Sequence, residues 1–321
     1  MSTIFVTGGS GFLGRHLLPF LTSHGEKVRA LARSEKSAEQ VRALGAEAAF
    51  GDLNDVAKLT EGMRGCEVVV HAAASTAEWG PYSEFYESNV TGTQNVLAAA
   101  KAAGVKRFVH VSTEAVLLDG SPLVKVDETR PLPAKAMGPY AETKNLAERE
   151  ALAAPGIEVV VVRPRFIWGK GDTTLLPKLV EMVKRGQFAW ISHGEALTST
   201  CHVDNVCEGI WLAAHKGQPG AIYFLTDGNE VKVRDFLTAL LGTQGVTPSG
   251  KSVPFGLALF FATLVEAVWR LFGLKSHPPL QRTSVILIGQ EVTVSDARAR
   301  RELGYTAQVT REQGLAELKG R

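Results

Sequence analysis

The sequence predicts a doubly wound parallel sheet of the α/β class, with a smaller second lobe toward the C-terminus. Three observations support this prediction. A short apolar strand, 4–6, runs through the glycine-rich turn Thr7–Gly14 into a segment with helical apolar spacing. Strand-like and helix-like segments then alternate at short intervals through the first half. The strands are near-continuous valine runs, which are typical of strands covered on both faces, and such repeated units place a ligand crevice at the carboxyl ends of the strands.

The expected elements follow one another closely in the first half and less regularly afterwards. After 4–6, the expected strands are 27–32, 46–50, 67–71, 107–111 and 158–162, with helices at 37–44 and about 86–103. Beyond Arg163-Pro164 the expected elements are a helix at 175–184, a strand at 221–225, a lipophilic stretch at 253–274, and a helix that opens near Ser295-Asp296 and closes at Leu303-Gly304.

This change of rhythm suggests a division of the chain. We expect residues 1–165 to form a nucleotide-binding domain, to which the chain returns near 200–226. Residues 166–321 are expected to form mainly a substrate-binding lobe, including the apolar segment 252–274.

Composition excludes several classes of function. The formal net charge is only +2, and no basic run is present, so a nucleic-acid partner is not expected. The cysteines Cys66, Cys201 and Cys207 are too few and too irregular for a disulfide framework or a zinc site, and no H-x-x-x-H pair occurs, so no metal is expected. The N-terminus enters a strand directly, without the features of a signal peptide. A cytoplasmic protein is therefore expected.

The turn after the first strand has the spacing of a phosphate-binding loop. Gly8, Gly11 and Gly14 follow the pattern G-x-x-G-x-x-G. A glycine-rich turn between strand and helix lets backbone N–H groups and the helix N-terminus approach a phosphate. The pattern differs from the general G-x-G-x-x-G fingerprint, and an ordinary tight turn is the alternative.

A second motif, Tyr140-Ala141-Glu142-Thr143-Lys144, has the spacing of an acid–base pair. Tyrosine and lysine four residues apart lie on one face of a helix. A nearby ammonium group favours the phenolate, so we expect Lys144 to lower the pKa of Tyr140 from its ordinary value of about 10. A hydroxyl from Val111-Ser112-Thr113-Glu114, at the end of the fifth strand, could hold a substrate oxygen against Tyr140. A solvated helix and a strand-end hydroxyl turn are the alternatives for these two motifs.

Together, these motifs resemble the extended short-chain dehydrogenase/reductases, and the resemblance covers nearly the whole chain. It implies a Rossmann fold, a nicotinamide cofactor and the catalytic residues Tyr140, Lys144 and Thr113, with Ser112 in reserve. The distance of the family's hydroxyl from the following Val116 selects Thr113. The cofactor contacts implied by the resemblance come from Gly8, Gly11, Phe12, Leu13, Gly14, Asp52, Leu53, Ala72, Ala73, Ala74, Tyr140, Lys144 and Pro164.

Two further stretches match family positions. Asn89 matches the asparagine in the helix that supports the active site. His202-Val203-Asp204 resembles a motif where the chain re-enters the main domain, and we interpret it as mainly structural.

The end of the second strand bears on the choice of cofactor. An acidic residue there would accept the ribose hydroxyls of NAD, whereas an arginine suits the 2′-phosphate of NADP. This chain has Ala32-Arg33-Ser34, and no carboxylate until Glu35. Arg33 therefore favours NADP(H) over NAD(H). In the alternative, Arg33 is simply solvated and Glu35 reaches back to the ribose.

The second lobe contains an uncharged run of 14 residues, 252–265, which continues to Leu274 with Glu266 and Arg270 as interruptions. The run is shorter than the ~20 residues that span a bilayer. It could form a buried helix, a lid over an apolar substrate or a peripheral membrane contact.

This segment and the C-terminal sequence narrow the resemblance to the 3β-hydroxysteroid dehydrogenase-like branch. That branch includes sterol dehydrogenases and reductases of long-chain β-keto acids, while dihydroflavonol-reductase-like enzymes share most of the first half. Trp79, Phe166 and Trp168 fall in loops where substrate contacts could lie, although packing is the commoner role of such aromatic residues.

The sequence as a whole predicts an NADP(H)-dependent oxidoreductase that interconverts a secondary alcohol and a ketone on a lipophilic substrate, steroid-like or a long-chain β-keto acid. Two alternatives are a nucleotide-sugar epimerase or dehydratase with bound NAD, and a non-catalytic NADP(H)-binding regulator. The apolar segment argues against the first, and the presence of both Tyr140 and Lys144 argues against the second. The resemblance also implies a homodimer.

Overall fold

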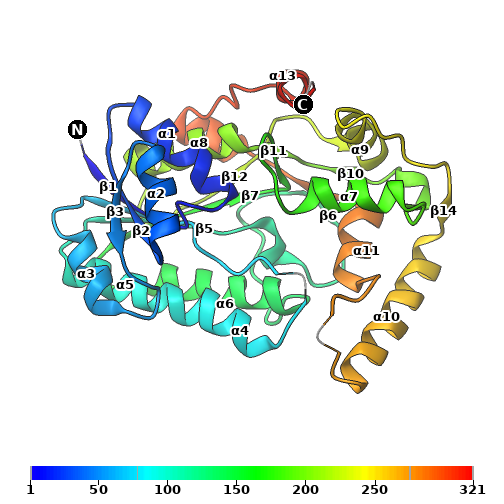
Figure 1. Cartoon of the computed structure of the whole chain (residues 1–321), viewed down its shortest axis with the longest axis horizontal. Helices are drawn as coiled ribbons and strands as arrows, with labels where there is room; N and C mark the ends of the chain where they lie inside the picture. Colours follow the sequence, from blue (N-terminus) through cyan, green and yellow to red (C-terminus); the bar gives the residue numbers. More distant parts are fainter. Residues whose placement is uncertain (1, 78, 275, 320–321) are drawn as a thin grey trace.

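The computed structural model describes residues 2–77, 79–274 and 276–319. Its centre is a seven-stranded sheet in which every strand pair is parallel (Figure 1). The strand order is β3-β2-β1-β4-β5-β7-β12, so the chain winds outward from β1 in both directions. The strands are β1 (Thr3–Thr7), β2 (Lys27–Ala32), β3 (Glu47–Phe50), β4 (Val68–His71), β5 (Arg107–Val111), β7 (Glu158–Pro164) and β12 (Ile222–Leu225). The expected doubly wound α/β sheet is confirmed.

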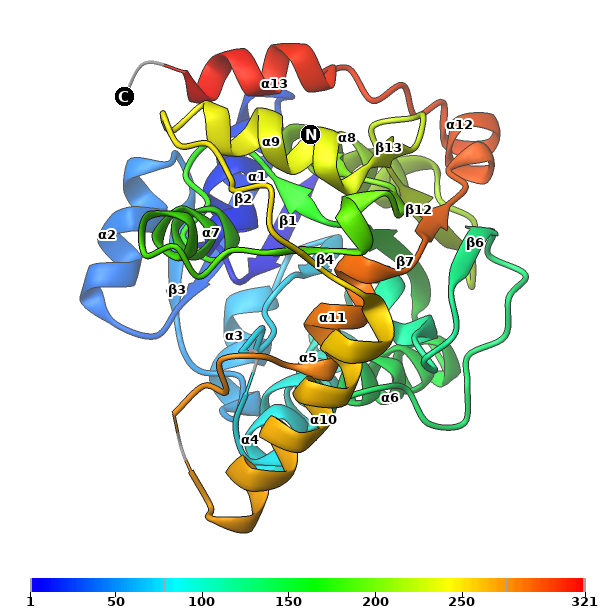
Figure 2. The same ribbon diagram turned by 90° about the vertical axis from the view of Figure 1, so that its right-hand side faces the viewer.

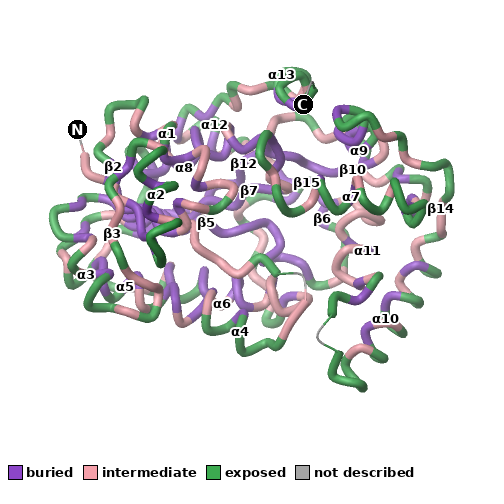
Figure 3. The backbone as a smooth tube through the Cα atoms, in the orientation of Figure 1, coloured by how far each residue is buried: buried purple, intermediate pink, exposed green. Residues whose placement is uncertain are grey.

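Helices cover both faces of this sheet (Figures 1 and 3). One layer consists of α1 (Phe12–Ser23), α2 (Glu35–Ala43), α8 (Val203–Lys216) and α12 (Ala297–Leu303), and the other of α3 (Val56–Met63), α5 (Gly92–Ala102) and α6 (Pro139–Ala153). The valine runs supply both interfaces because neighbouring residues of a strand face opposite sides. On β7, Val160 and Val162 pack into the first interface, whereas Val159 and Val161 pack into the second.

The long helix expected at 86–103 is divided into three parts. It begins with α4 (Tyr82–Tyr86), continues as the π-helical turn η1 (Glu87–Thr91), and becomes regular again in α5. A π-helical turn inserts an extra residue and often occurs at a functional site. Here it contains Asn89.

The second lobe is built on a four-stranded sheet of order β13-β10-β15-β6 and two small two-stranded sheets, β11-β8 and β14-β9. Its strands are β6 (Leu123–Val126), β8 (Ile167–Trp168), β9 (Trp190–Ile191), β10 (Leu197–Thr198), β11 (Cys201–His202), β13 (Val231–Lys232), β14 (Ser252–Val253) and β15 (Val292–Val294). The accompanying helices are α7 (Leu175–Lys184), α9 (Val233–Gly242), α10 (Phe255–Leu271), α11 (Arg282–Gly289) and α13 (Arg311–Leu318), with short 3₁₀ turns η2 (Glu114–Leu117) and η3 (Ser192–Gly194).

The chain crosses between the two parts more often than a boundary at residue 165 suggests. The strand β6 comes from the first half yet pairs with β15 in the lobe sheet. In the other direction, α12 returns from the C-terminal part and packs Ala299 and Leu303 into the core beside the main sheet.

The lipophilic stretch forms α10, which extends away from the body of the molecule (Figures 1 and 2). Ala258 and Ala262 face inward, toward α11. The large apolar side chains along its outer face and just beyond it are exposed: Leu257, Phe260, Phe261, Leu264, Val268, Leu271, Phe272 and Leu274. We call this set the α10 apolar face. Among the described residues, no helix is long and apolar enough to cross a membrane.

Candidate active site

The glycine loop between β1 and α1 is packed too closely against neighbouring backbone to carry side chains at two of its glycines. Gly8 has φ +79°, and a Cβ there would come within 2.9 Å of the Ala73 backbone nitrogen. A Cβ on Gly14 would overlap the carbonyl oxygens of Gly8 and Gly9. No side chain within the described part of the molecule caps the N-terminus of α1, so its first N–H groups remain available to an anion. This cradle fits the pyrophosphate of a dinucleotide cofactor.

A buried hydrogen-bonded network fixes the loop against the neighbouring strand end. The Ala73 N–H donates to Thr7 Oγ1 at 3.1 Å, and Thr7 Oγ1 lies 2.8 Å from His71 Nδ1. On the other side of the ring, His71 Nε2 lies 3.0 Å from the Thr93 hydroxyl, which donates to the Asn89 carbonyl. Burial, assisted by the charge of Lys144, lowers the pKa of His71 to about 3, so the ring is neutral at physiological pH. The neutral ring with its proton on Nε2 satisfies both contacts.

Asn89 joins this network to the helix that carries the candidate acid. Its side-chain oxygen accepts from the Ser75 N–H at 2.7 Å, and its amide donates to the Thr143 hydroxyl at 3.0 Å. Thr143 lies on α6 between Tyr140 and Lys144. The extra residue in η1 thus occurs where one side chain connects the loop after β4 to the helix that carries Tyr140 and Lys144.

Tyr140, Lys144 and the end of β5 meet at the carboxyl edge of the sheet. The buried Lys144 ammonium donates to the Val111 carbonyl at 2.8 Å. The Thr113 hydroxyl forms a hydrogen bond with the phenol of Tyr140. Burial lowers the pKa of Lys144 to about 8, although the charge of Glu148 opposes that shift.

The two candidate hydroxyls have separate partners. Ser112 donates to Glu148 Oε2 at 2.5 Å, and Glu148 forms a buried ion pair with Arg163. Thr113 donates to Glu114 Oε2 at 2.8 Å and accepts from the Ala115 N–H at 3.2 Å. Of these two hydroxyls, that of Thr113 is the one that lies beside Tyr140.

The expected lowering of the Tyr140 pKa by Lys144 is wrong for this structure. Burial raises the pKa of Tyr140 well above its ordinary value, and the negative charge of Glu114 adds to that rise. The Thr113 hydrogen bond opposes it. A raised pKa leaves the phenol protonated, which suits a proton donor.

At the end of β2, Arg33 is exposed and has no partner among the described residues. Glu35, the carboxylate that could have reached back to a ribose, is bound instead by Arg42 at 2.7 Å. Asp52 closes the turn after β3 by accepting from the Asn54 N–H at 3.0 Å. The neighbouring Leu53 lies against Gly92 at the start of α5.

The sequence candidates still to be placed are Pro164, Trp79, Phe166 and Trp168. Pro164 ends β7 at the carboxyl edge and is paired with Leu225. Trp79 donates from its indole nitrogen to the Leu274 carbonyl at 3.3 Å, which ties the loop after β4 to the segment after α10.

Trp168 and Phe166 pack into the core of the lobe against Phe236. Trp168 is only 1% exposed and donates to Asp227 at 2.7 Å. The expectation that Trp168 contacts the substrate is therefore wrong, because its side chain has almost no exposed surface left for a ligand.

The His202-Val203-Asp204 stretch has a structural role. His202 Nδ1 accepts from the Asp204 N–H at 3.3 Å and caps α8, while Asp204 binds His16 on α1 at 2.7 Å. Glu317 completes a group whose possible ligand atoms lie within 4.8 Å of one another, but two of its three members already have these protein partners.

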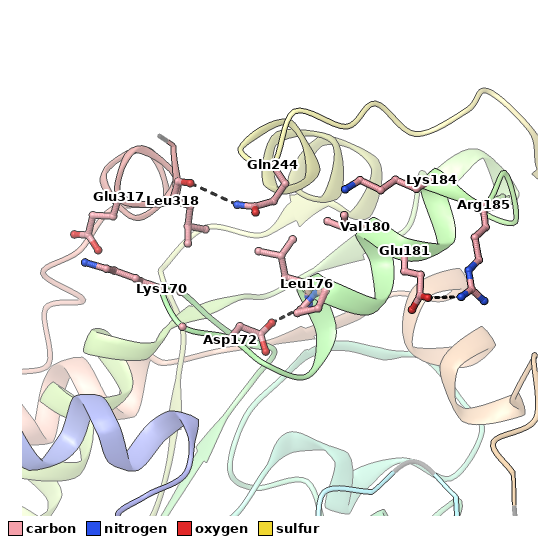
Figure 4. A pocket seen from close by; sticks show the side chains of 13 residues that line it. Lys170, Asp172, Leu176, Val180, Glu181, Lys184, Arg185, Gln244, Glu317 and Leu318 are labelled. Carbon is pink, nitrogen blue, oxygen red and sulfur yellow. Dashed lines mark hydrogen bonds and ion pairs between the residues drawn. The ribbon is translucent and has the colours of Figure 1, made fainter. Parts of the chain in front are cut away.

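A surface groove of about 670 Å³ lies apart from Thr113, Tyr140 and Lys144, between α7, α9 and α13 (Figure 4). Leucine, valine and proline side chains of α7 line it. The Glu181–Arg185 ion pair lies at one end, and Gln244 donates to the Leu318 carbonyl across it.

Sequence reasoning missed four buried charged residues around the site: Glu114, Glu148, Arg163 and Arg165. Glu148 follows Lys144 by four residues, so helical spacing could have placed the two side by side. Glu114 follows Thr113 directly. Arg165 lies 51 residues further along the chain, and its 2.9 Å ion pair with Glu114 depends on β5 and β7 being neighbours.

The chain also matches known proteins over most of its length. The model of the NAD dependent epimerase/dehydratase family matches residues 4–225. A 4-hydroxy-2-methyl-3-oxo-4-farnesyl-3,4-dihydroquinoline-1-oxide ketoreductase from Stigmatella aurantiaca is 51% identical over 317 residues, covering 98% of this chain and 95% of that protein.

Two more distant relatives also align along nearly the whole chain. A decarboxylating sterol-4-alpha-carboxylate 3-dehydrogenase from Dictyostelium discoideum is 33% identical, covering 99% of this chain and 100% of that protein. A 2-alkyl-3-oxoalkanoate reductase from Stenotrophomonas maltophilia is 35% identical, covering 98% of each. The crystal structure of gox2253 has a TM-score of 0.80 and 28% identity, covering 99% of this chain and 98% of that one.

Proposed function

We propose that this chain, which belongs to the NAD-dependent epimerase/dehydratase family, reduces a ketone on a lipophilic substrate with NADPH. It is an NAD(P)-dependent oxidoreductase of the extended short-chain type, acting between CH–OH and C=O groups. The observation that supports this most directly is the meeting of Tyr140 and Lys144, on one helix, with Thr113 at the carboxyl edge of the sheet. A phenol that keeps its proton is suited to giving it to a carbonyl oxygen.

The residues divide the work as follows. Gly8, Gly14 and the N-terminus of α1 would hold the cofactor's pyrophosphate, and, when bound, the reduced nicotinamide supplies the hydride that becomes bonded to the carbonyl carbon. Tyr140 gives its proton to the carbonyl oxygen, which leaves an alcohol and a phenolate. The phenolate then regains a proton from solvent. Lys144, whose pKa is about 8, carries a positive charge at neutral pH and stabilises the transient negative charge of the phenolate.

NADPH is favoured by the surroundings of Arg33. Its guanidinium is free to meet a 2′-phosphate, whereas Glu35 is held by Arg42. A guanidinium binds a phosphate through charge-assisted hydrogen bonds and has no comparable partner on a plain ribose.

The proposed substrate class rests on the relatives and on the α10 apolar face. The three relatives described above are named for a farnesylated quinoline N-oxide, a sterol carboxylate and a 2-alkyl-3-oxoalkanoate. All three carry a large apolar part. We propose a farnesylated or similarly apolar cyclic ketone first, because the most identical of these relatives carries that name.

The α10 apolar face also leads us to propose a peripheral membrane contact, from which such a substrate would reach the site. Eight large apolar side chains are exposed there, from Val268 at 37% to Leu271 at 79%. We further propose a cytoplasmic homodimer. Free, buried cysteines suit a reducing compartment, and the exposed aromatic side chains of Tyr82 and Tyr86 on α4 lie beside α6, where a second copy could cover them.

The function is tested by following NADPH and NADH oxidation with a 3-ketosteroid, a long-chain 2-alkyl-3-keto acid, a farnesylated quinolone ketone and a UDP-sugar. Turnover of an apolar ketone with NADPH, lost in Tyr140→Phe but kept in Tyr86→Phe, is the expected result. Conversion of the UDP-sugar without net cofactor change would instead indicate an epimerase. Absence of turnover with every ketone would contradict the proposal.

A further inference from the structure

The surroundings of the α10 apolar face carry exposed charge of one sign. Between residues 250 and 281 the sequence contains a single acidic residue, Glu266. That side chain is buried against α11, where its carboxylate accepts the Arg282 N–H at 2.7 Å, and the Arg270 guanidinium lies 3.6 Å from it. The described residues of this stretch therefore expose no carboxylate beside the apolar face (Figure 3).

Positive side chains lie at both ends of the face. Lys251 is exposed just before β14, which leads into α10, and Arg270 lies in the last turn of the helix with 65% of its side chain exposed. His277 is exposed a little further along the chain. The 17 residues of α10 span about 25 Å. If the helix lies flat in a membrane interface, both cations are at the level of the lipid headgroups.

The face itself offers few hydrogen bonds to a partner. The exposed side chains that define it are all aliphatic or phenyl groups. The hydroxyl of Thr263, which lies on the same helix, donates to the Leu259 carbonyl. Protein interfaces carry about one hydrogen bond per 100–200 Å². A surface of this composition therefore suits hydrocarbon better than the surface of another protein.

The same charges disfavour a second copy of the chain on this face. Two α10 helices packed antiparallel would bring Arg270 of one copy close to Lys251 of the other, and a parallel pair would bring each cation close to its own counterpart. Like charges at close range repel each other. Glu84, an exposed acid near the loop after β4, lies on α4 beside α6. An anionic surface avoids this repulsion.

Two tryptophans hold the segment that follows α10. Trp269 donates from its indole nitrogen to the Ser276 carbonyl at 2.9 Å, and Trp79 donates to the Leu274 carbonyl at 3.3 Å. The guanidinium of Arg270 lies 5.9 Å from the centre of the Trp79 ring. Both indoles are half-buried. Amphipathic rings of this kind are enriched at the headgroup level of membranes.

The helix behind the apolar face leads to the candidate active site. α11 packs against α10 on one side. On the other side, the Leu287 carbonyl of α11 accepts from Arg165 at 3.3 Å. A Cβ on Gly138, two residues before Tyr140, would come within 3.0 Å of the Thr283 hydroxyl of α11. A bilayer on the outer face of α10 is thus one helix away from the elements that hold Tyr140.

We propose that the α10 apolar face, with Lys251 and Arg270 at its ends, docks selectively on bilayers that contain anionic phospholipid, with α10 lying in the plane of the interface. This inference rests on the peripheral membrane contact proposed above and adds the chemistry of the membrane. The apolar side chains enter the acyl region, and the two cations meet lipid phosphates. An apolar ketone dissolved in that bilayer is then held next to α11.

The test compares flotation of the full chain with vesicles of phosphatidylcholine alone and with vesicles of equal parts phosphatidylcholine and phosphatidylglycerol. The wild type should bind the anionic vesicles about 10- to 30-fold more tightly, because each Lys or Arg near an anionic surface contributes a factor of about five. The preference should disappear near 1 M salt, where the screening length is only about 3 Å.

Three variants separate charge from other effects. Lys251→Gln combined with Arg270→Gln should bind both kinds of vesicle equally, as tightly as the wild type binds the neutral ones. Arg270→Lys keeps the charge but removes the guanidinium near Trp79, so it should keep the lipid preference. The matched control is Arg64→Gln combined with Lys106→Gln, two exposed cations that precede β4 and β5, and it should bind as the wild type does.

The outcomes distinguish this inference from the proposals on which it builds. Equal binding of the wild type to both kinds of vesicle would overturn the selectivity for anionic lipid and leave the membrane contact in place. A wild type that floats with neither would overturn both. A dimer without vesicles that Phe260→Glu with Leu271→Glu converts to a monomer would show that a second copy covers the face instead. Ketone reduction is measured without vesicles, so its absence would contradict the proposed reaction and not the lipid preference.

Discussion

Ser112 and Thr113 are consecutive residues, yet their hydroxyls serve different buried carboxylates. Ser112 donates to Glu148 at 2.5 Å, and Thr113 donates to Glu114 at 2.8 Å. The first hydroxyl therefore stabilises the packing of α6 on β7, while the second lies at the phenol of Tyr140. Neighbouring positions with the same chemistry thus have separable effects.

This separation predicts different results for two small substitutions. Thr113→Val should lower kcat for ketone reduction by about 100-fold, because it removes the group that orients the Tyr140 proton, with little effect on stability. Ser112→Ala should keep most of the activity but lose about 1–3 kcal/mol of unfolding free energy, because the Glu148–Arg163 pair loses a donor. Steady-state kinetics and urea unfolding of both variants distinguish the effects, and the reverse pattern would reassign the hydroxyl.

The glycine loop leads to a prediction about cofactor binding. In Gly14→Ala, the added methyl group would meet the carbonyl oxygens of Gly8 and Gly9, so the loop must open and its N–H groups must turn away from the phosphate. We expect NADPH binding to be lost in calorimetric titration, with substrate turnover lost as well. Gly250→Ala is the matched control, because its methyl group would meet nothing within 4 Å. Normal NADPH affinity in Gly14→Ala would rule out this loop as the phosphate site.

Cofactor choice should depend on one exposed side chain. Arg33→Ser should raise KM for NADPH by about 10- to 100-fold, the loss expected for hydrogen bonds to a charged phosphate, and leave KM for NADH nearly unchanged. Arg64→Ser, an exposed arginine between α3 and β4, is the control for a general change of charge. If both cofactors lost affinity equally in Arg33→Ser, the proposed contact with the 2′-phosphate would be wrong.

Buried His71 makes stability depend on pH. Its pKa is about 3 in the folded protein and near 6.5 when exposed, so below pH 6.5 the unfolded chain binds a proton that the folded protein does not. Its contribution is therefore complete above pH 6.5 and decreases by about 1.4 kcal/mol per pH unit as the pH falls toward 3. His110, whose pKa is also lowered by burial, acts in the same direction.

The measurement is urea unfolding at several pH values between 5 and 7. His71→Asn should reduce the slope of unfolding free energy against pH by about 1.4 kcal/mol per unit, the equivalent of one proton. His277→Gln, at an exposed position, should keep the full slope. Equal slopes in the wild type and His71→Asn would show that His71 is protonated alike in both states.

The α10 apolar face predicts binding to lipid vesicles. The wild type should float with phosphatidylcholine–phosphatidylglycerol vesicles, whereas Phe260→Glu combined with Leu271→Glu should stay in solution, because each side chain contributes about 1.5–3 kcal/mol when buried in an apolar phase. Val124→Glu, an exposed apolar site on β6, should float like the wild type. A wild type that does not float would contradict the membrane contact.

The strands of the main sheet could be predicted because long apolar runs determine them. β5, for instance, begins and ends at the residues expected from its sequence, Arg107 and Val111. The strands of the lobe could not be predicted in this way, because strands as short as Ile167–Trp168 and Trp190–Ile191 contain no full period of apolar and polar alternation. Gly304, with φ +74°, ends α12 where its sequence indicated.

The site shows the same division between local and distant information. The spacing of Tyr140 and Lys144 indicated that they share a helix face, and they do. The sign of the Tyr140 pKa shift could not be predicted, because it depends on burial and on Glu114, which Arg165 fixes from another strand. Likewise, Trp168 lies in a loop-like stretch of sequence but is enclosed by Phe236 and His202 from distant segments.

The pairing of β6 with β15 has a consequence for the order in which the molecule can be made. Leu123 meets Val292 and Val126 meets Val294, so a strand from the first half waits for a partner near the C-terminus. During synthesis, β6 therefore leaves the ribosome long before that edge can close, and such distant pairing slows folding. A nascent chain shortened before residue 292 would have the glycine loop and all seven strands of the main sheet, but an unfinished lobe in which β6 is unpaired. That open edge is one on which chaperones or aggregation could act.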